Sequence, residues 1–141
     1  MGKTFSCIII LLASSLCFAH KATAGIFRSD IVIAGGGTSG VTAAVQAARL
    51  GASVVVVEQT TWLGGMLTAA GVGAVDGNYN MPAGLWGEFR DSLAAHYGSL
   101  EALKTGWVSN VMFEPSVGNR IFHNMVAKEK GVTLWTGSEV K

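Results

Sequence analysis

Residues 30–40, with the sequence DIVIAGGGTSG, and the residues that follow them decide the fold. Residues 31–34 form an apolar run of the length and β-branched character expected of a buried parallel strand. Three glycines come next, and residues 41–50 are mostly small side chains that predict a helix. Gly51 is placed to close that helix as its C-terminal cap. The stretch therefore predicts a strand, a glycine turn and a helix.

The three glycines have the spacing G-x-G-x-x-G, which in this context is the fingerprint of a dinucleotide-binding turn. Gly35 permits a tight turn, Gly37 lets the backbone approach a pyrophosphate, and Gly40 lets helix and strand pack closely. The helix would direct its free N–H groups and positive dipole end at the phosphates. Thr38 and Ser39, inside the turn, join the candidate cofactor-binding residues.

A second strand is predicted over residues 53–58, and it ends in a carboxylate, Glu58. Glu58 follows Gly40 by eighteen residues. In a dinucleotide-binding unit an acid about 20 residues after the glycines binds the ribose hydroxyls. An isolated acid at the end of a strand is usually a solvated side chain. After a strand, turn and helix of this kind, the ribose role is the preferred interpretation of Glu58.

Residues 1–24 have the form of a secretory signal peptide. Lys3 supplies the positive charge, residues 5–18 are uncharged and largely apolar, and ATA at residues 22–24 matches a cleavage site. The apolar stretch is shorter than the ~20 residues that span a bilayer. The small-residue cleavage site argues against a signal anchor, and the large residue before Cys17 argues against a lipoprotein. We therefore expect a secreted or periplasmic protein with no membrane contact after cleavage.

Cleavage after residue 24 would leave residues 25–141, a stretch of 117 residues without cysteine. This excludes disulfides, a thiolate metal site and a C-x-x-C redox pair, and no metal site is predicted. The stretch carries eight Lys and Arg against nine Asp and Glu. Such a balance does not suggest a nucleic-acid or anionic-membrane partner.

Residues 59–73, with the sequence QTTWLGGMLTAAGVG, are the second informative stretch. Gly64 and Gly65 follow Glu58 by six and seven residues, where the backbone must again approach a ligand without interference from a Cβ atom. A mobile glycine loop is the alternative. The neighbouring side chains are more apolar than a solvated loop should be, so we expect a packed loop lying along a ligand. These apolar side chains are Trp62, Leu63, Met66 and Leu67.

Glu58-x5-Gly64-Gly65 after the glycine turn resembles the FAD-dependent oxidoreductases of the glutathione-reductase-like superfamily. More narrowly, residues 58–75, with LGGM at their core, are similar to a group named simply FAD-dependent oxidoreductase. FEP at residues 113–115, the helix predicted after it, and GVTL at residues 131–134 resemble the same group. The resemblance covers nearly all of the chain after residue 24.

The resemblance implies an α/β fold, a Rossmann-like βαβ FAD-binding domain with a parallel sheet, over residues 25–141. It also implies hydride transfer between a small-molecule substrate and the flavin. The three glycines of the turn would serve the FAD pyrophosphate, and Glu58 the adenosine ribose. Gly64, Gly65 and Met66 would lie near the pyrophosphate and the flavin end. Val140, which follows the last predicted strand, would meet the adenine through its backbone.

Further elements are predicted along the rest of the chain. They are helices over residues 85–97 and 116–130, a helical turn over residues 99–104, and strands over residues 108–113 and 132–136. Ser116 is the predicted N-cap of the second helix, and Gly131 its C-terminal cap. Gly98 is expected to stop the first helix, and Ser99 to cap the turn.

Only three credible sheet strands are available, whereas a doubly wound sheet needs strands on both sides of the first. We therefore expect the N-terminal portion of a larger flavoprotein, incomplete and inactive by itself. An NAD-type dinucleotide-binding module is an alternative that the double-glycine segment disfavours, and a non-catalytic fragment is another. No catalytic acid or base is nominated, because Glu114, His96 and His123 each have an adequate structural explanation.

Overall fold

The structure of the protein is a computed structural model that describes residues 25–77, 79–107 and 109–141. The predicted signal peptide, residues 1–24, lies outside the described residues. In chain order the elements are β1 (Ile31–Ala34), α2 (Thr38–Arg49), β2 (Val54–Glu58), the 3₁₀ turn η1 (Gly65–Leu67), β3 (Ala74–Val75), α3 (Gly84–Tyr97), the 3₁₀ turn η2 (Glu101–Leu103), β4 (Val111–Met112), α4 (Pro115–Ala127) and β5 (Val132–Thr136).

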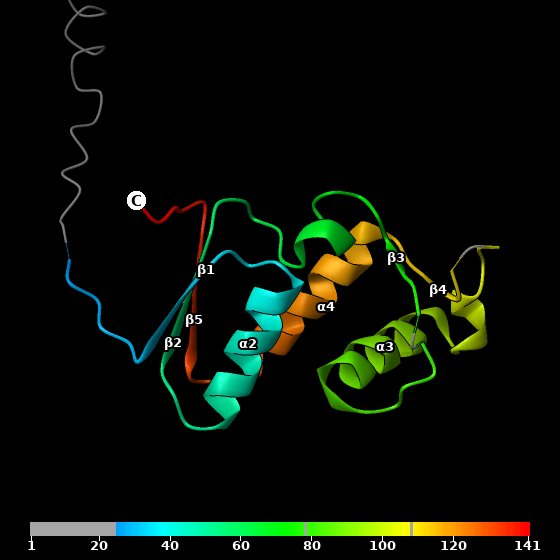
Figure 1. The fold of residues 1–141 in the computed structure, drawn as a ribbon, viewed down its shortest axis with the longest axis horizontal. Helices are drawn as coiled ribbons and strands as arrows, with labels where there is room; N and C mark the ends of the chain where they lie inside the picture. Colours follow the sequence, from blue (N-terminus) through cyan, green and yellow to red (C-terminus); the bar gives the residue numbers. More distant parts are fainter. Residues whose placement is uncertain (1–24, 78, 108) are drawn as a thin grey trace, which may run out of the picture.

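A parallel sheet with the order β1-β2-β5 forms one end of the molecule, and α2 and α4 lie beside it (Figure 1). The predicted βαβ unit and parallel sheet are confirmed. β2 is the central strand, and its four valines, residues 54–57, are all buried. β1 has one strand neighbour among the described residues, and the Val32 side chain is 62% exposed. Among the described residues β1 is therefore an edge strand and largely exposed, so the prediction that residues 31–34 form a buried strand is wrong.

α2 lies close against the sheet because its inner face carries small side chains. Ala44 is completely buried and packs with Val54 and Val56. The helix ends in a Schellman arrangement: the N–H of Gly51 donates to the Ala48 carbonyl at 2.9 Å, and the N–H of Ala52 donates to the Ala47 carbonyl at 3.1 Å. Gly51 has a φ of 95°, so the predicted glycine cap is confirmed.

The limits of α4 differ from those predicted. The N-cap is Glu114 rather than Ser116, and Pro115 occupies the first helical position. Proline suits that position because it lacks an N–H that the helix would leave unpaired. The helix ends at Ala127 with Lys128 as its C-cap, so the prediction of Gly131 as the cap is wrong. Gly131 directly precedes β5, and its carbonyl accepts the Val54 N–H at 2.8 Å. The helix buries a stripe of apolar side chains, namely Val117, Ile121, Phe122, Met125 and Val126.

The other end of the molecule contains α3, η2 and a short antiparallel pair, β3 with β4 (Figure 1). Gly98 ends α3 with a φ of 95°, and Ser99 Oγ accepts the Ala102 N–H at 3.1 Å, as predicted for both residues. β3 was not predicted. The strand expected over residues 108–113 is shorter, since β4 covers only Val111–Met112 of its described part.

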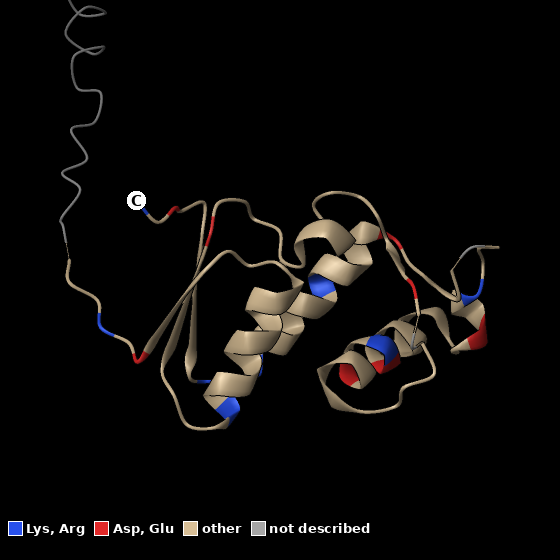
Figure 2. Ribbon diagram, in the orientation of Figure 1, with Lys and Arg blue, Asp and Glu red and all other residues tan. Residues whose placement is uncertain are grey.

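Charged residues of both signs are spread over the helices and connecting loops rather than gathered on one element (Figure 2). None of the helices in the described ranges combines the length and the apolar character that a bilayer crossing requires.

Candidate functional site

The turn between β1 and α2 uses each of its three motif glycines differently. Gly35 has a φ of 100°, a conformation that other residues rarely adopt. A Cβ atom on Gly40 would collide with the carbonyl of Gly35, so this glycine permits the close contact of turn and helix. A Cβ atom on Gly37, the N-cap of α2, would meet nothing within 4 Å. Gly37 thus leaves open space at a helix N-terminus.

Glu58 is fixed at the end of β2 by hydrogen bonds from the backbone. Its Oε2 accepts the Gly36 N–H at 2.7 Å, and its Oε1 accepts the N–H and the hydroxyl of Thr60, each at 2.8 Å. Partial burial acts to raise the pKa of the carboxyl, but the hydrogen bonds from Thr60 and Gly36 outweigh it and hold the pKa of Glu58 below its usual value. The side chain is therefore an anion whose Oε2 can accept a further hydrogen bond.

A cavity of about 290 Å³ lies at the carboxyl ends of β1 and β2. Its wall includes Val140, which comes from the segment after β5. That segment is attached to β2 because the Ser138 N–H donates to the Glu58 carbonyl at 3.0 Å. The structure thus brings Gly35, Glu58 and Val140 together in one cavity. The lining residues are Ala34, Gly35, Val57, Glu58, Gln59, Ser138, Glu139 and Val140.

The double-glycine segment packs directly on the glycine turn. The Gly64 N–H donates to the Gly36 carbonyl at 2.8 Å, and the Thr38 hydroxyl donates to the Gly64 carbonyl at 2.8 Å. A Cβ atom on Gly64, where φ is 106°, would approach the Phe122 ring to 2.5 Å. Leu63 is completely buried, whereas Met66 is 69% exposed. The segment is therefore a packed loop, as predicted, with Met66 turned towards solvent.

These features fit the adenosine diphosphate half of a dinucleotide. Gly37 provides a space that any Cβ atom would fill, and the first turn of α2 presents N–H groups that have no partner inside the helix. Glu58 supplies an anionic acceptor in the adjoining cavity. Ser39 is exposed beside this turn, whereas the Thr38 hydroxyl is committed to Gly64.

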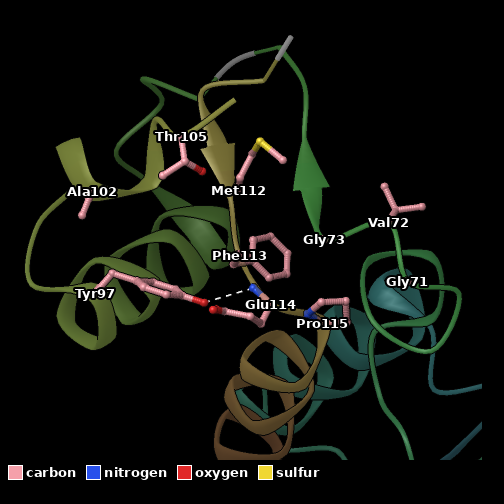
Figure 3. Close-up of a pocket in the computed structure, with 10 residues that line it drawn as sticks. All are labelled: Gly71, Val72, Gly73, Tyr97, Ala102, Thr105, Met112, Phe113, Glu114 and Pro115. Atoms are coloured by element: carbon pink, nitrogen blue, oxygen red, sulfur yellow. Dashed lines mark hydrogen bonds between the residues drawn. The ribbon is translucent and has the colours of Figure 1, made fainter. Parts of the chain in front are cut away.

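A second cavity, of about 440 Å³, lies at the other end of the molecule, and sequence reasoning missed it (Figure 3). Its residues come from three segments with no common spacing, so no motif could have marked it. The sequence feature that came closest to marking this cavity is the FEP run at residues 113–115, whose three residues all line it. The lining residues are Gly71, Val72, Gly73, Tyr97, Ala102, Thr105, Met112, Phe113, Glu114 and Pro115.

Comparisons with known proteins place this chain in a family. The family described as FAD dependent oxidoreductase matches residues 30–141. Over 44 residues the chain is 48% identical to the thiamine thiazole synthase of Aeropyrum pernix; the match covers 31% of this chain and 16% of that protein. The chain thus spans about a sixth of the curated relative that it matches.

The chain is also similar to solved structures, among them CabE and THI4. CabE, an aromatic hydroxylase from angucycline biosynthesis, has 18% identity and a TM-score of 0.51 over 79% of this chain and 24% of that chain. THI4 of Thermovibrio ammonificans has 16% identity and a TM-score of 0.45 over 94% of this chain and 43% of that chain.

The likeness to CabE shows the fold, which is the Rossmann-like fold of FAD-binding domains. The family match covers most of the chain and includes the glycine turn, Glu58 and the double-glycine segment. FAD is therefore the cofactor. On this evidence the chain belongs to the family of FAD-dependent oxidoreductases.

Proposed function

We propose that this chain binds FAD through its glycine turn and Glu58, and that it serves an oxidoreductase in which hydride passes between a small-molecule substrate and the flavin. The observation that carries the proposal is the shared cavity of Gly35, Glu58 and Val140 next to the open position at Gly37. A dinucleotide needs a pyrophosphate site and a ribose site side by side. This arrangement supplies both.

The glycine turn and the cavity each have a part in binding the adenosine half. The open space at Gly37 admits the pyrophosphate, and the first turn of α2 donates N–H groups to it. The free acceptor position on Glu58 Oε2 takes a ribose hydroxyl, while the bond from Gly36 keeps the carboxylate in place. The backbone near Val140 forms the wall for the adenine.

The double-glycine segment continues the binding surface towards the flavin. Its bonds to Gly36 and Thr38 hold the backbone of Gly64 against the turn. Bound FAD supplies the hydride chemistry at its flavin ring, and the protein binds and orients the ring. Met66, exposed beside Gly65, would cover the cofactor and exclude water from it.

We test the proposal by titrating the full chain with FAD and following the quenching of flavin fluorescence. Glu58→Ala should weaken binding roughly ten- to hundredfold, because it removes charge-assisted hydrogen bonds of about 1.5–3 kcal/mol. Glu101→Ala is the matched control, since the Glu101 side chain is exposed and pairs only with Lys104 in the described structure. Equal FAD affinity in the parent and Glu58→Ala proteins would show that the ribose assignment is wrong.

The same titration with NAD separates the NAD-type alternative. The double-glycine segment extends the binding surface beyond the pyrophosphate, so FAD should bind more tightly than NAD. Tighter binding of NAD would support the alternative instead.

Export is part of the proposal and rests on residues 1–24 of the sequence. Cleavage should leave a protein that begins at Gly25, in the periplasm or outside the cell. N-terminal sequencing of the exported protein checks this. Retention of Met1 in a membrane fraction would indicate an anchor.

A further inference from the structure

We propose that the second cavity binds a small organic amine that also carries a hydroxyl group, with Glu114 as its counter-ion and Tyr97 as its hydrogen-bond donor. Its volume of about 440 Å³ falls within the range of small-molecule sites. Val72, Met112, Phe113 and Pro115 give it an apolar lining, as such sites have. It shares no lining residue with the cavity that contains Glu58.

Tyr97 is held in a defined position at the wall of this cavity. Its hydroxyl oxygen accepts the Glu114 N–H at 3.0 Å, the bond drawn as a dashed line in Figure 3. The His96 ring packs edge-on against the Tyr97 ring with their centroids 4.7 Å apart. Because the oxygen accepts the backbone bond, the hydroxyl hydrogen remains to be donated to a ligand.

Glu114 provides the charge. Its side chain is exposed, and it forms no capping hydrogen bond and no ion pair within the described structure. It lies beside Tyr97, whose hydroxyl accepts its backbone N–H (Figure 3). An ionised carboxylate accepts hydrogen bonds but cannot donate any, so it favours a ligand with a protonated amine.

The other charges near the cavity leave that preference in place. Glu114 is the one acidic or basic residue among those that line the cavity. Lys104 and Glu101, on the neighbouring turn, neutralise each other at 2.9 Å. Arg120 contacts the His96 ring at 3.3 Å and does not line the cavity. The cavity therefore carries one acidic group, the Glu114 carboxylate, which matches an ammonium group on the ligand. The Tyr97 hydroxyl matches a hydroxyl on the same ligand.

Three probes with the same phenyl ring test the proposal on the full chain without FAD: phenylethanolamine, phenylethylamine and mandelate. Binding is followed by the NMR shifts of the Gly71 and Gly73 amides, which line the cavity. Phenylethanolamine should bind most tightly, since it carries both the amine and the hydroxyl. Mandelate keeps the hydroxyl but has a carboxylate in place of the aminomethyl group, and it should bind at least about tenfold more weakly.

Substitutions of Glu114 and Tyr97 test separately how the charge and the hydroxyl contribute to the expected order of probe affinities. Glu114→Gln keeps the shape but removes the charge, so the advantage of phenylethanolamine over mandelate should disappear. Tyr97→Phe should make phenylethanolamine and phenylethylamine equal. Glu101→Gln, outside the lining residues, should leave the order of the probes unchanged.

The result does not depend on the cofactor. FAD affinity should be the same in the parent and Glu114→Gln proteins, so failure at this cavity is distinguishable from failure at Glu58. The proposal is overturned if mandelate binds as tightly as phenylethanolamine, if Glu114→Gln preserves the preference, or if phenylethanolamine does not bind at millimolar concentration.

Discussion

Two regions of this molecule are held in place in different ways. The cradle region, residues 30–64 with residues 132–140, is fixed mainly by its backbone: the Gly64 N–H donates to the Gly36 carbonyl, and the Gly35 N–H donates to the Val57 carbonyl, each at 2.8 Å. The cleft region, residues 71–115, is fixed mainly by side chains. There the Phe89 and Phe113 rings meet edge to face with centroids 5.5 Å apart.

This difference explains why one region is evident from the sequence and the other is not. A close backbone contact needs glycine at defined positions, so it leaves a spacing that can be recognised. Side-chain packing is satisfied by many apolar residues of suitable volume, so it leaves only a periodic pattern. Substitutions that add side-chain atoms should therefore destabilise the cradle region, whereas substitutions that remove side-chain atoms should destabilise the cleft region.

The largest effect is expected at Phe122, which serves both regions. Its ring is 1% exposed, stacks on Phe89 with centroids 4.4 Å apart, and fills the space beside Gly64. Phe122→Ala should destabilise the fold by about 3–5 kcal/mol because it leaves a cavity. Phe27→Ala is the control, since Phe27 is 53% exposed and touches Trp135 at its edge. Urea unfolding followed by far-UV circular dichroism measures both; equal losses would contradict the role given to Phe122.

The sensitivity of the cradle region to added atoms is tested by a pair of glycines. Gly40→Ala should lower the free energy of unfolding by about 1–3 kcal/mol, because the new methyl group meets the Gly35 carbonyl. Gly37→Ala should leave it unchanged within about 0.5 kcal/mol, because its Cβ atom enters open space. Thermal unfolding separates the two variants. The comparison of regions fails if Gly40→Ala is as stable as Gly37→Ala.

Arg90 tests whether side chains order the cleft region. Its guanidinium donates to the Met81 carbonyl at 3.1 Å and to the Tyr79 carbonyl at 3.4 Å, and it pairs with Asp91 at 2.8 Å. Arg90→Met keeps the apolar stem but removes these bonds, at a cost of about 1–2 kcal/mol. Amide hydrogen exchange should increase in residues 79–83 and remain unchanged in β2. Faster amide exchange in β2, with no change in residues 79–83, would contradict the role given to Arg90 in ordering the cleft region.

The smallest effect concerns acid stability and Glu58. Because the folded pKa of this carboxyl is lowered, its contribution is fully present above the ordinary value of 4.5 and is lost as the pH falls through the lowered value. One proton accounts for at most about 1.4 kcal/mol per pH unit. Glu58→Gln should therefore make the decline of stability below pH 4.5 shallower.

The decline should not vanish in that variant, because other carboxyls also have lowered pKa values. The Ser53 hydroxyl lowers the pKa of Asp30, and the Arg49 guanidinium lowers the pKa of Glu88. Urea midpoints measured across the acid range give both slopes. An identical decline in parent and variant would show that the bonds from Gly36 and Thr60 do not favour the charged form of Glu58.

Several elements were predictable because local chemistry determines them. β1 and β5 have the predicted limits, and α2 ends where Gly51 permits the Schellman arrangement. The start of α4 was misplaced because Ser116 is a good N-cap by residue type. Pro115 at the first helical position decided the start instead.

Other features depend on contacts between distant segments. β3 consists of two residues, and its pairing with β4 is marked by no alternating pattern. The bond from Glu114 to Tyr97 joins residues 17 positions apart in different elements. The adjacency of Glu58 and Val140 was implied by the family resemblance, since nothing in the local sequence around Val140 indicates it.

The most direct test of FAD binding at this cradle is a titration of the Gly37→Val protein with FAD. Valine can adopt the extended backbone of this position, where φ is −62° and ψ is 175°, so the thermal midpoint should match that of the parent. Its side chain would occupy the space that the pyrophosphate requires, so FAD affinity should fall by about a hundredfold, or about 2.7 kcal/mol. Ala43→Val, on the exposed face of α2, should change neither quantity. A folded Gly37→Val protein that binds FAD as tightly as the parent would contradict the account.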